Sequence, residues 1–483
     1  MGATPAAGPI DTATRPFETI HGARAGILVA TLILGVLSYQ LNASMLSPAL
    51  PDMAKSLNTS VEAVSNVSST FFLAGAVGGI LFTRWSDFIG RRRGLLIVLV
   101  ALMLGTVLCI FAPNLQVLLI GRILQGASNA TYNFAYLILA ERLSAKKFGI
   151  AIGAVSAANG GVGGLDGLLG GYLSDSFGYR AIFIVIFAVG VVAALLAISI
   201  VPKDRPFSTG RMDWWGLAVL SIGLICFSEA ISTASGAGVT SALFILYVLG
   251  AITAFVAFWF IEKASKTNAL VQPKHLKSRR TWPLLATTIL SLAGVYSFTT
   301  FSVVLLAEDA QTGFGLNATI TGLLFLVPPA IIGAICAPLV GWIANRTDWV
   351  WTLRVGMFAC VAILIALSVF TFDKWAVFAL TALTGIALNA MVFTTLNGLS
   401  VLLAPKDAPA VLSGLNGASF GIGAGLGIAL VAPFVALGTH AGYTTSLLIS
   451  IGVAALAAIA TLLLRRPETS SPASEGAPAG ATV

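Results

Sequence analysis

Five polar residues recur at helical spacing inside one long apolar stretch of the sequence. Arg122, Gln125, Asn129, Asn133 and Tyr136 follow one another at intervals of three or four residues, so they fall along one side of a helix. Such a stripe is costly to expose to lipid. Hydrogen bonding between packed helices is one role for these groups. The buried arginine favours another, a water-filled cavity that binds a small molecule.

A carboxyl group is expected near this stripe. Arg122 and Asp166 each lie about six residues from the outer ends of their predicted membrane spans, which is roughly 9 Å of helix. Asn42 lies at a similar depth in the first span. We therefore expect Arg122, Asp166 and Asn42 to form a polar cluster. A carboxyl group at that depth is suited to bind and release a proton as its access to water changes, so the cluster predicts proton coupling.

Four further polar residues lie inside apolar stretches, namely Asn159, Tyr296, Asn389 and Asn416. We expect them to line the same cavity from both halves of the chain. Hydrogen bonding between helices is the alternative role for each of them.

The sequence predicts no cofactor, no metal site and no enzymatic centre. The three His residues occur singly, and the four Cys residues show no paired spacing. The run Gly421-Ile-Gly-Ala-Gly425 lies in an apolar stretch and lacks the Lys-Ser/Thr pair of a phosphate-binding loop. A polytopic membrane enzyme would need a His, Cys or paired-acid constellation at one membrane face. An ion gradient or simple facilitation is then the expected energy source.

The elements that must position these residues are membrane-spanning helices. Hydrophobic residues make up 57% of the chain, charged residues 10%, and the mean hydropathy is +0.94, which excludes a water-soluble protein of this length. A span needs roughly 20 apolar residues. Fourteen stretches meet this requirement: 25–49, 61–83, 94–112, 115–139, 148–172, 179–201, 214–234, 240–261, 282–307, 318–343, 350–371, 375–402, 411–438 and 442–464.

The distribution of positive charge predicts the orientation of these spans. Of the 27 Lys and Arg residues, 23 fall in alternate gaps that we assign to the inside, three fall outside, and Arg122 lies within a span. This asymmetry follows the positive-inside rule and predicts a multi-pass protein of the plasma or inner cell membrane with both termini in the cytoplasm. The net charge of +8 therefore reports orientation and predicts no nucleic-acid partner.

The chain divides into two similar halves. Thr83-Arg-Trp-Ser-Asp87 after the second span parallels Gly341-Trp-Ile-Ala-Asn345 after the tenth. We expect an all-α fold of two six-helix bundles, with the substrate site at the interface between the repeats. The expected segments are a cytoplasmic segment (1–24), an N-terminal bundle (25–201), two extra helices with a cytoplasmic linker (202–281), a C-terminal bundle (282–464) and a disordered tail (465–483).

Two motifs carry a family resemblance. Asp87-Phe-Ile-Gly90-Arg91-Arg92-Arg93 resembles the loop between the second and third helices of the major facilitator superfamily, and Gly121-Arg122-Ile-Leu-Gln125-Gly126 resembles its fourth-helix motif. Asp213-Trp-Trp-Gly216, with the linker 272–276, is similar to the fourteen-helix drug:proton antiporter branch. The resemblance implies alternating access, with Asp87, Gly90, Arg91 and Arg92 forming a latch between the bundles. Read without the resemblance, the same charges anchor the topology.

The sequence departs from the resembling branch at two acids. The branch usually carries an acid where this chain has Asn42, and its fifth helix usually reads Gly-Pro-x-x-Gly-Gly where this chain has Asp166-Gly-Leu-Leu-Gly-Gly171. Either the acid has moved to another helix and proton coupling is preserved, or the mode of transport differs.

The sequence thus predicts a monomeric secondary transporter whose partners are a small-molecule substrate, protons and the lipid bilayer. The resemblance implies export of small organic or drug-like compounds by proton antiport. The alternative is a proton symporter that takes up a polar or anionic metabolite, for which Arg122 would bind the substrate.

Overall fold

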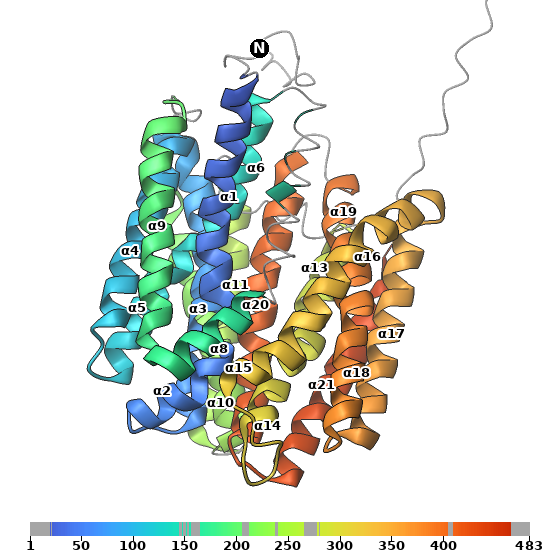
Figure 1. The fold of residues 1–483 in the computed structure, drawn as a ribbon. Helices are drawn as coiled ribbons and strands as arrows, with labels where there is room; N and C mark the ends of the chain where they lie inside the picture. The colour runs from blue at the N-terminus through green and yellow to red at the C-terminus, as the bar shows by residue number, and fades with distance from the viewer. Residues whose placement is uncertain are drawn as a thin grey trace, which may run out of the picture.

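The fold is seen in a computed structural model that describes residues 20, 22–143, 147, 151, 154–155, 165–204, 212–236, 240–264, 278–279, 281–403 and 409–464. Every regular element in these ranges is a helix, with labels as in Figure 1. The first half contains α1 (Ala23–Ser44), the 3₁₀ turn η1 (Ser47–Ala49), α2 (Leu50–Ser56), α3 (Val61–Ile89), α4 (Arg91–Ile110), α5 (Leu115–Gly126), the 3₁₀ turn η2 (Ala127–Asn129), α6 (Ala130–Arg142), α8 (Leu165–Phe177) and α9 (Arg180–Ile200).

The second half follows two intervening helices, α10 (Trp214–Gly236) and α11 (Ala242–Ala264). It contains α13 (Trp282–Ser291), the π-helical segments η3 (Leu292–Tyr296) and η4 (Phe298–Ser302), α14 (Val303–Glu308), α15 (Ala318–Thr321), the π-helical η5 (Gly322–Leu326), α16 (Val327–Arg346), α17 (Trp349–Phe370), α18 (Lys374–Thr384), the π-helical η6 (Gly385–Phe393), α19 (Thr394–Leu402), α20 (Pro409–Val435) and α21 (His440–Leu463).

Twelve helical segments of the described chain are long and apolar enough to cross a membrane. Two of the fourteen predicted spans are not among them. The span 115–139 is a continuous helical run of α5, the turn η2 and α6, and its polar stripe makes it less apolar than the other spans. The span 148–172 lies partly outside the described residues. The structure therefore shows an all-helical polytopic protein, and the count of fourteen stays a prediction.

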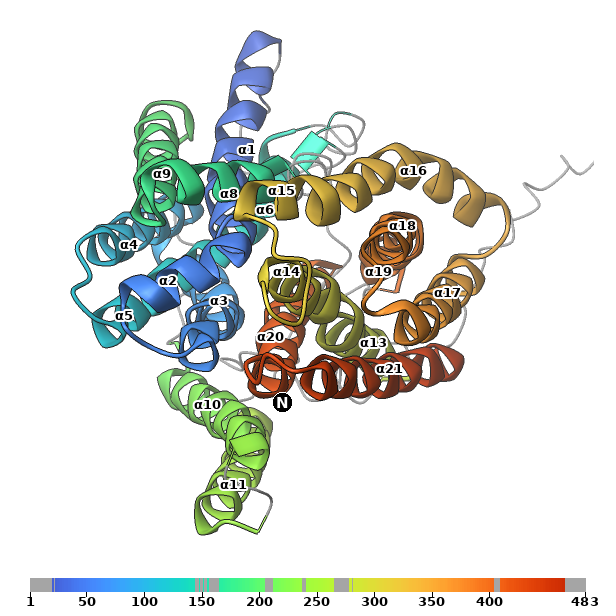
Figure 2. The ribbon, with the colours of Figure 1, turned by 60° about the horizontal axis from the view of Figure 1, so that its bottom comes forward.

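The helices form two groups with a separate pair beside them. Figure 1 shows the first group of helices (α1–α9) on one side and the second (α13–α21) on the other, and Figure 2 shows that α10 and α11 stand beside them as a pair. The long helices α3 and α20 pack against each other between the groups, and α10 packs on both α20 and α3. Each group has a buried apolar cluster, and the cluster of the first group also includes residues of α14 and α20.

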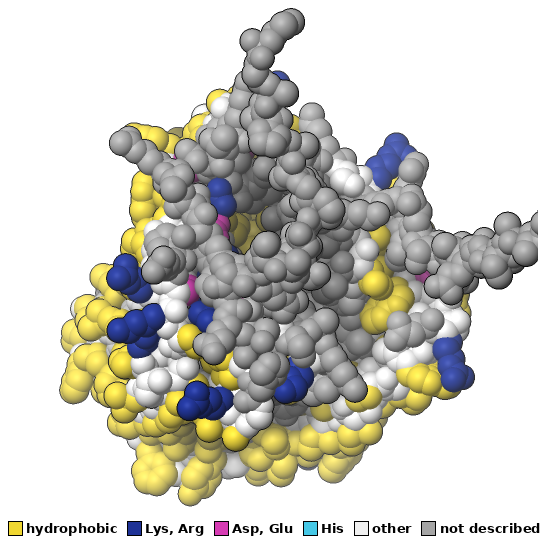
Figure 3. Space-filling view, turned by 90° about the horizontal axis from the view of Figure 1, so that it is seen from above, with side chains coloured by type: hydrophobic (Ala, Val, Ile, Leu, Met, Phe, Trp, Pro, Cys, Tyr) yellow, Lys and Arg dark blue, Asp and Glu magenta, His cyan; other side chains and the backbone are white. Residues whose placement is uncertain are grey.

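Positive side chains lie at one end of the molecule. At the end where α1 begins and α3 ends, Lys and Arg side chains gather on the surface (Figure 3); we call this end the basic face. The other end, which carries α2 and α15 (Figure 1), is called the opposite face. The Lys and Arg residues at the basic face, such as Arg84, Arg91 and Arg92, belong to gaps that the charge pattern assigns to the inside.

Glycine allows the two bundles to approach closely. A Cβ atom on Gly421 of α20 would lie 2.7 Å from the Phe72 carbonyl oxygen of α3, and one on Gly171 of α8 would lie 2.4 Å from the Ala318 carbonyl oxygen of α15. Contacts this short leave no room for a side chain, so these two glycines mark close contacts between the bundles.

Candidate functional site

Arg122 is enclosed by groups of the first bundle. Its Nε donates to the Val67 carbonyl oxygen at 2.9 Å, and Nη1 donates to Gln125 Oε1 at 2.8 Å and to Asn42 Oδ1. Its Nη2 donates to the Asn42 carbonyl oxygen at 3.2 Å, and the guanidinium lies 4.1 Å from the centroid of the Phe71 ring. Only 1% of the residue is exposed. The predicted contact between Arg122 and Asn42 is therefore present, and it ties α1, α3 and α5 together.

Asp166 of α8 contacts a different side of α1 from the side that carries Asn42 and faces Arg122. Its Oδ2 accepts a hydrogen bond from Ser44 Oγ, its Oδ1 is buried without a hydrogen-bond partner, and 2% of the residue is exposed. No ion pair joins it to Arg122 within the described part of the chain. The reason is rotational: Asn42 and Ser44 are two residues apart on α1, which turns them about 200° from each other. The expected three-residue cluster is thus divided in two.

Ser44 connects Asp166 to a further polar group. Its hydroxyl donates to the Gln40 carbonyl oxygen at 2.8 Å and accepts from Gln40 Nε2 at 3.1 Å. Neither Ser44 nor Gln40 was predicted from the sequence, although the two residues are four apart and so share one side of the first span.

Of the remaining stripe residues, Asn129 joins helices within the first bundle and Asn133 faces the second bundle. Asn129 donates to the Gly75 carbonyl oxygen of α3 at 2.8 Å, which is an interhelical hydrogen bond. Asn133 Nδ2 donates to Thr83 Oγ1 at 2.9 Å, while its Oδ1 lies 3.7 Å from where a Cβ of Gly417 on α20 would stand. Asn133 therefore faces the second bundle.

Two tyrosines of α6 continue this surface. The Tyr136 hydroxyl donates to the Tyr132 hydroxyl at 2.9 Å, and both residues are partly exposed. Tyr132 was not selected from the sequence, although it lies three residues after Asn129 and four before Tyr136 and so shares the side of the helix that carries the stripe.

The second bundle contributes amides and aromatic rings. Asn389 donates to the Pro329 carbonyl oxygen at 3.1 Å, and Asn416 Nδ2 donates to Asn397 Oδ1 at 3.2 Å while its Oδ1 accepts from Thr288 Oγ1 at 2.7 Å. These side chains hydrogen-bond between helices, as the alternative reading of the sequence expected. Asn159 lies outside the described residues.

Tyr296 and Phe393 lie between the bundles, since both pack against the two apolar clusters. Their ring centroids are 6.4 Å apart, and Phe393 is 5.1 Å from Phe420. Tyr296 belongs to η3 and Phe393 to η6, both π-helical, a conformation that occurs often at functional sites. Sequence reasoning missed the two phenylalanines, because an aromatic residue in an apolar helix has no distinguishing pattern.

The four residues of the predicted latch lie at the basic face. Asp87 pairs with Arg91 and with Arg84, each at 2.7 Å, and Arg91 Nε contacts Glu141 Oε1 at 3.3 Å. Gly90 joins α3 to α4 with φ of 94°, a conformation that favours glycine.

Asp204 completes this connection at the basic face. Its carboxylate accepts from the backbone N–H groups of Arg91 and Arg92 at the start of α4, and the Arg92 side chain donates to the Ile198 carbonyl oxygen of α9. These contacts tie α3 to α4, α6 and the end of α9. Asp204 was not selected from the sequence.

The fold and the site together define a polytopic membrane transporter: two helical groups meet along α3 and α20, with polar and aromatic side chains between them. The profile of the Major Facilitator Superfamily matches residues 32–428, and the chain belongs to this family. The family and its transporter members identify a transporter and not an enzyme.

The similar proteins are named for different substrates. The chain is 34% identical to the uridine/deoxyuridine transporter of Lactococcus lactis subsp. cremoris (strain MG1363) over 430 residues, which covers 87% of this chain and 89% of that protein. It is 26% identical to the multidrug resistance protein Stp of Mycobacterium tuberculosis (strain CDC 1551 / Oshkosh) over 413 residues, which covers 83% of this chain and 74% of that protein.

Two solved structures share the fold. The human organic anion transporter MFSD10 (TETRAN) superposes with a TM-score of 0.62 at 15% identity, covering 91% of this chain and all of that chain. A partially occluded inward open conformation of the xylose transporter XylE from E. coli superposes with a TM-score of 0.61 at 14% identity, covering 91% of this chain and 97% of that chain.

Proposed function

We propose that this protein takes up a neutral, nucleoside-like compound together with a proton, and that Asp166 is the proton-binding group. The observation that carries the proposal is the separation of Arg122 from Asp166: Arg122 is enclosed by protein acceptors, whereas Asp166 has a hydroxyl neighbour and an unpartnered oxygen.

The surroundings of Arg122 favour a neutral substrate. The guanidinium has five N–H groups, and four hydrogen bonds to Val67, Asn42 and Gln125 occupy most of them. A buried arginine used in this way joins helices and is poorly placed to bind an anion. This argues against an anionic metabolite and against Arg122 as its ligand.

The interface between the bundles suits a base and a sugar. Tyr296, Phe393 and Phe420 offer aromatic faces on which a planar base can stack. Asn133 and the tyrosine pair of α6 offer donors and acceptors for hydroxyl and carbonyl groups. The uridine/deoxyuridine transporter with which the chain is 34% identical supports this substrate class.

The hydrogen bonds of Ser44 need one more hydrogen than its hydroxyl supplies, which supports proton binding at Asp166. A serine hydroxyl has a single hydrogen, yet Ser44 Oγ lies within hydrogen-bond distance of both the Gln40 carbonyl oxygen and Asp166 Oδ2. Both contacts are hydrogen bonds at the same time when the carboxyl group carries a proton and donates it to Ser44. An ionised carboxylate loses one of them and also remains a buried, unpaired charge, which is costly.

The proposed topology and transport cycle follow from the family and from the charge and hydropathy of the sequence. We infer that the basic face is cytoplasmic, that fourteen helices cross the cell membrane, and that a monomer alternates between openings to the two faces. The described fold presents the opposite face with the bundles in contact through α8 and α15.

Export of drug-like compounds by proton antiport is the second candidate. It is favoured by the multidrug resistance protein Stp, with which the chain is 26% identical. Asp166 serves as the proton site in this candidate also, so substrate and direction distinguish the two.

The test is transport by the purified chain in proteoliposomes with an imposed pH gradient. We expect labelled uridine to accumulate in vesicles with an alkaline interior, to compete with unlabelled deoxyuridine, and to be unaffected by cationic dyes. Dye transport driven by the gradient, without uridine transport, would replace the first candidate by the second. Vesicles without protein supply the background.

A further inference from the structure

At the opposite face, one carboxylate of the first bundle holds two donors of the second. Asp175 lies near the end of α8, and its Oδ2 accepts from the backbone N–H of Thr319 at 2.8 Å and from the Thr319 hydroxyl at 2.5 Å. Thr319 belongs to α15, which is 144 residues further along the chain. A charged acceptor makes such hydrogen bonds about twice as strong as neutral ones.

Glycine residues of α8 allow its backbone to approach the second bundle closely beside this contact. Gly167, Gly171 and Asp175 are four residues apart and therefore share one side of α8. A Cβ on Gly167 would lie 2.5 Å from Leu326 Cδ1, and one on Gly171 would lie 2.4 Å from the Ala318 carbonyl oxygen. The carboxylate thus extends a line of contacts between the bundles toward the outer end of α8.

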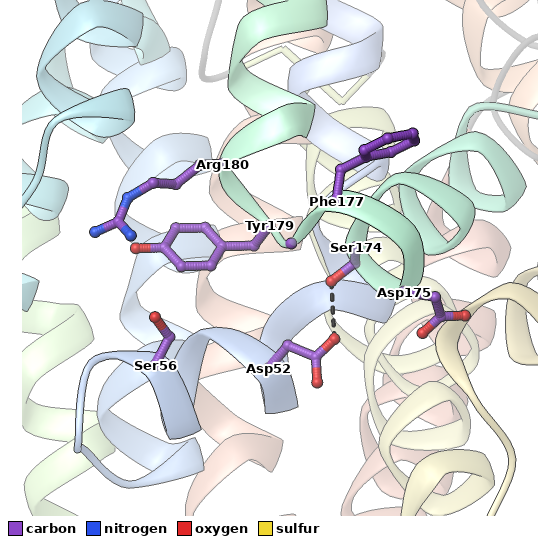
Figure 4. A pocket seen from close by; sticks show the side chains of 8 residues that line it. Asp52, Ser56, Ser174, Asp175, Phe177, Tyr179 and Arg180 are labelled. Carbon is purple, nitrogen blue, oxygen red and sulfur yellow. Dashed lines mark hydrogen bonds between the residues drawn. The ribbon is translucent and has the colours of Figure 1, made fainter.

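A second carboxylate fixes α8 on its own side. Asp52 of α2 accepts a hydrogen bond from Ser174 Oγ at 2.9 Å, as Figure 4 shows. Asp52, Ser174 and Asp175 line a pocket of about 440 Å³ together with Tyr179 and Arg180. Ser174 is therefore hydrogen-bonded within the first bundle, whereas the next residue, Asp175, is hydrogen-bonded to the second bundle.

We propose that Asp175 and Thr319 form a second latch, separate from the predicted one at the basic face, and that it sets the fraction of molecules closed at the opposite face. Opening of that face must break both hydrogen bonds and expose the carboxylate to water. Asp175 acts as a positioning residue: it does not touch the proposed substrate but stabilises one of the two access states. The latch rests on the alternating access of the proposed function, and not on the identity of the substrate.

The chain supplies a matched control for this residue. Asp373 also lies at the opposite face and also accepts from two donors, the backbone N–H groups of Trp375 at 2.9 Å and Ala376 at 3.0 Å. Both donors belong to α18, so this carboxylate caps a helix within one bundle. Replacing Asp373 therefore removes a carboxylate with similar bonding but leaves the contact between bundles intact.

The experiment measures the distance between the bundles at the opposite face. Spin labels are placed at Phe177, after which α8 ends, and at Leu437, after α20; these residues are 70% and 63% exposed. The measurement uses the full chain in lipid nanodiscs, with the four native cysteines replaced. In Asp175→Ala the ratio of the long to the short distance should rise about tenfold, as expected for the loss of two hydrogen bonds between the bundles.

Graded variants separate the latch from a loss of folding. Asp175→Asn keeps an acceptor and should give a smaller shift, and Thr319→Val keeps the backbone donor and should do the same. Asp373→Ala should lower thermal stability with no change of distance. The latch is overturned if Asp175→Ala leaves the distances unchanged or if Asp373→Ala changes them equally. Failure of uridine transport would leave this outcome unaffected, so the two proposals are tested separately.

Discussion

Replacing Asp166 with asparagine should separate substrate movement from proton movement. The amide has nearly the same shape as the carboxyl group and can donate to Ser44 as the protonated acid does, so the packing of α8 on α1 is retained. It cannot take up a proton. We therefore expect Asp166→Asn to exchange substrate across the membrane but to lose accumulation driven by a pH gradient.

The expected magnitude follows from the number of proton sites. Among the described residues, Asp166 and Glu262 are the acids with least exposure, and Glu262 lies in the last turn of α11, a helix that stands beside the two groups. Glu308, which also has a buried oxygen without a hydrogen-bond partner, is the last residue of α14. We assign the coupled proton to Asp166 alone. One proton for each substrate is then the expected stoichiometry. One pH unit corresponds to about 1.4 kcal/mol, so a gradient of about two units can drive accumulation of about a hundredfold. The variant should accumulate none.

The assay compares two measurements on the same proteoliposomes. Counterflow of labelled against unlabelled substrate reports exchange, and steady-state uptake under an imposed gradient reports coupling. Glu229→Gln is the control, since Glu229 is an exposed acid on α10, and it should keep both activities. Full accumulation by Asp166→Asn would refute the assignment of the proton site. Loss of counterflow as well would indicate a wider role for this carboxyl group.

Three further changes test the packing and the site. Arg122→Leu removes the donor to Val67, Asn42 and Gln125 and should lower the free energy of unfolding by about 3 kcal/mol, measured by thermal or chemical unfolding in detergent. Gly421→Val places a side chain against a carbonyl oxygen of α3 and should reduce transport and thermal stability, whereas Gly452→Val, with no heavy atom within 4 Å of the new Cβ, should change neither. Asn133→Ala should raise KM for substrate about tenfold with little change in maximal rate, as expected for a lost substrate contact, measured by initial rates of uptake.

The hydropathy of the chain predicts most helices closely, because the bilayer sets the length of an apolar span. The predicted span 179–201 corresponds to α9 (Arg180–Ile200), and 442–464 corresponds to α21 (His440–Leu463). The break at Ala127–Asn129 could not be predicted. No proline marks it, and the turn packs closely against α3, since a Cβ on Gly78 would lie 3.0 Å from the Ala127 Cα atom.

The site was only partly predictable, because position in a span gives depth but not rotation. Depth correctly placed Asn42 beside Arg122. It also placed Asp166 at that level, but it could not say which side of α1 the carboxyl group faces. The structure turns it toward Ser44, two residues beyond Asn42. Long-range contacts such as Asp175 with Thr319 leave no trace in a local pattern, since their partners are far apart in the sequence.

The placement of Asp166 on α8 links the proton site to the movement of the bundles. Gly167 is the next residue, and it contacts Leu326 of the second bundle directly. Asp175 lies nine residues beyond Asp166 on the same helix and contacts Thr319. A shift of α8 away from the second bundle must therefore alter the surroundings of Asp166 and break the contacts of Gly167 and Asp175 together. Arg122, held within the first bundle, needs no such change. One helix can thus couple proton binding to opening, while the arginine keeps its bundle rigid.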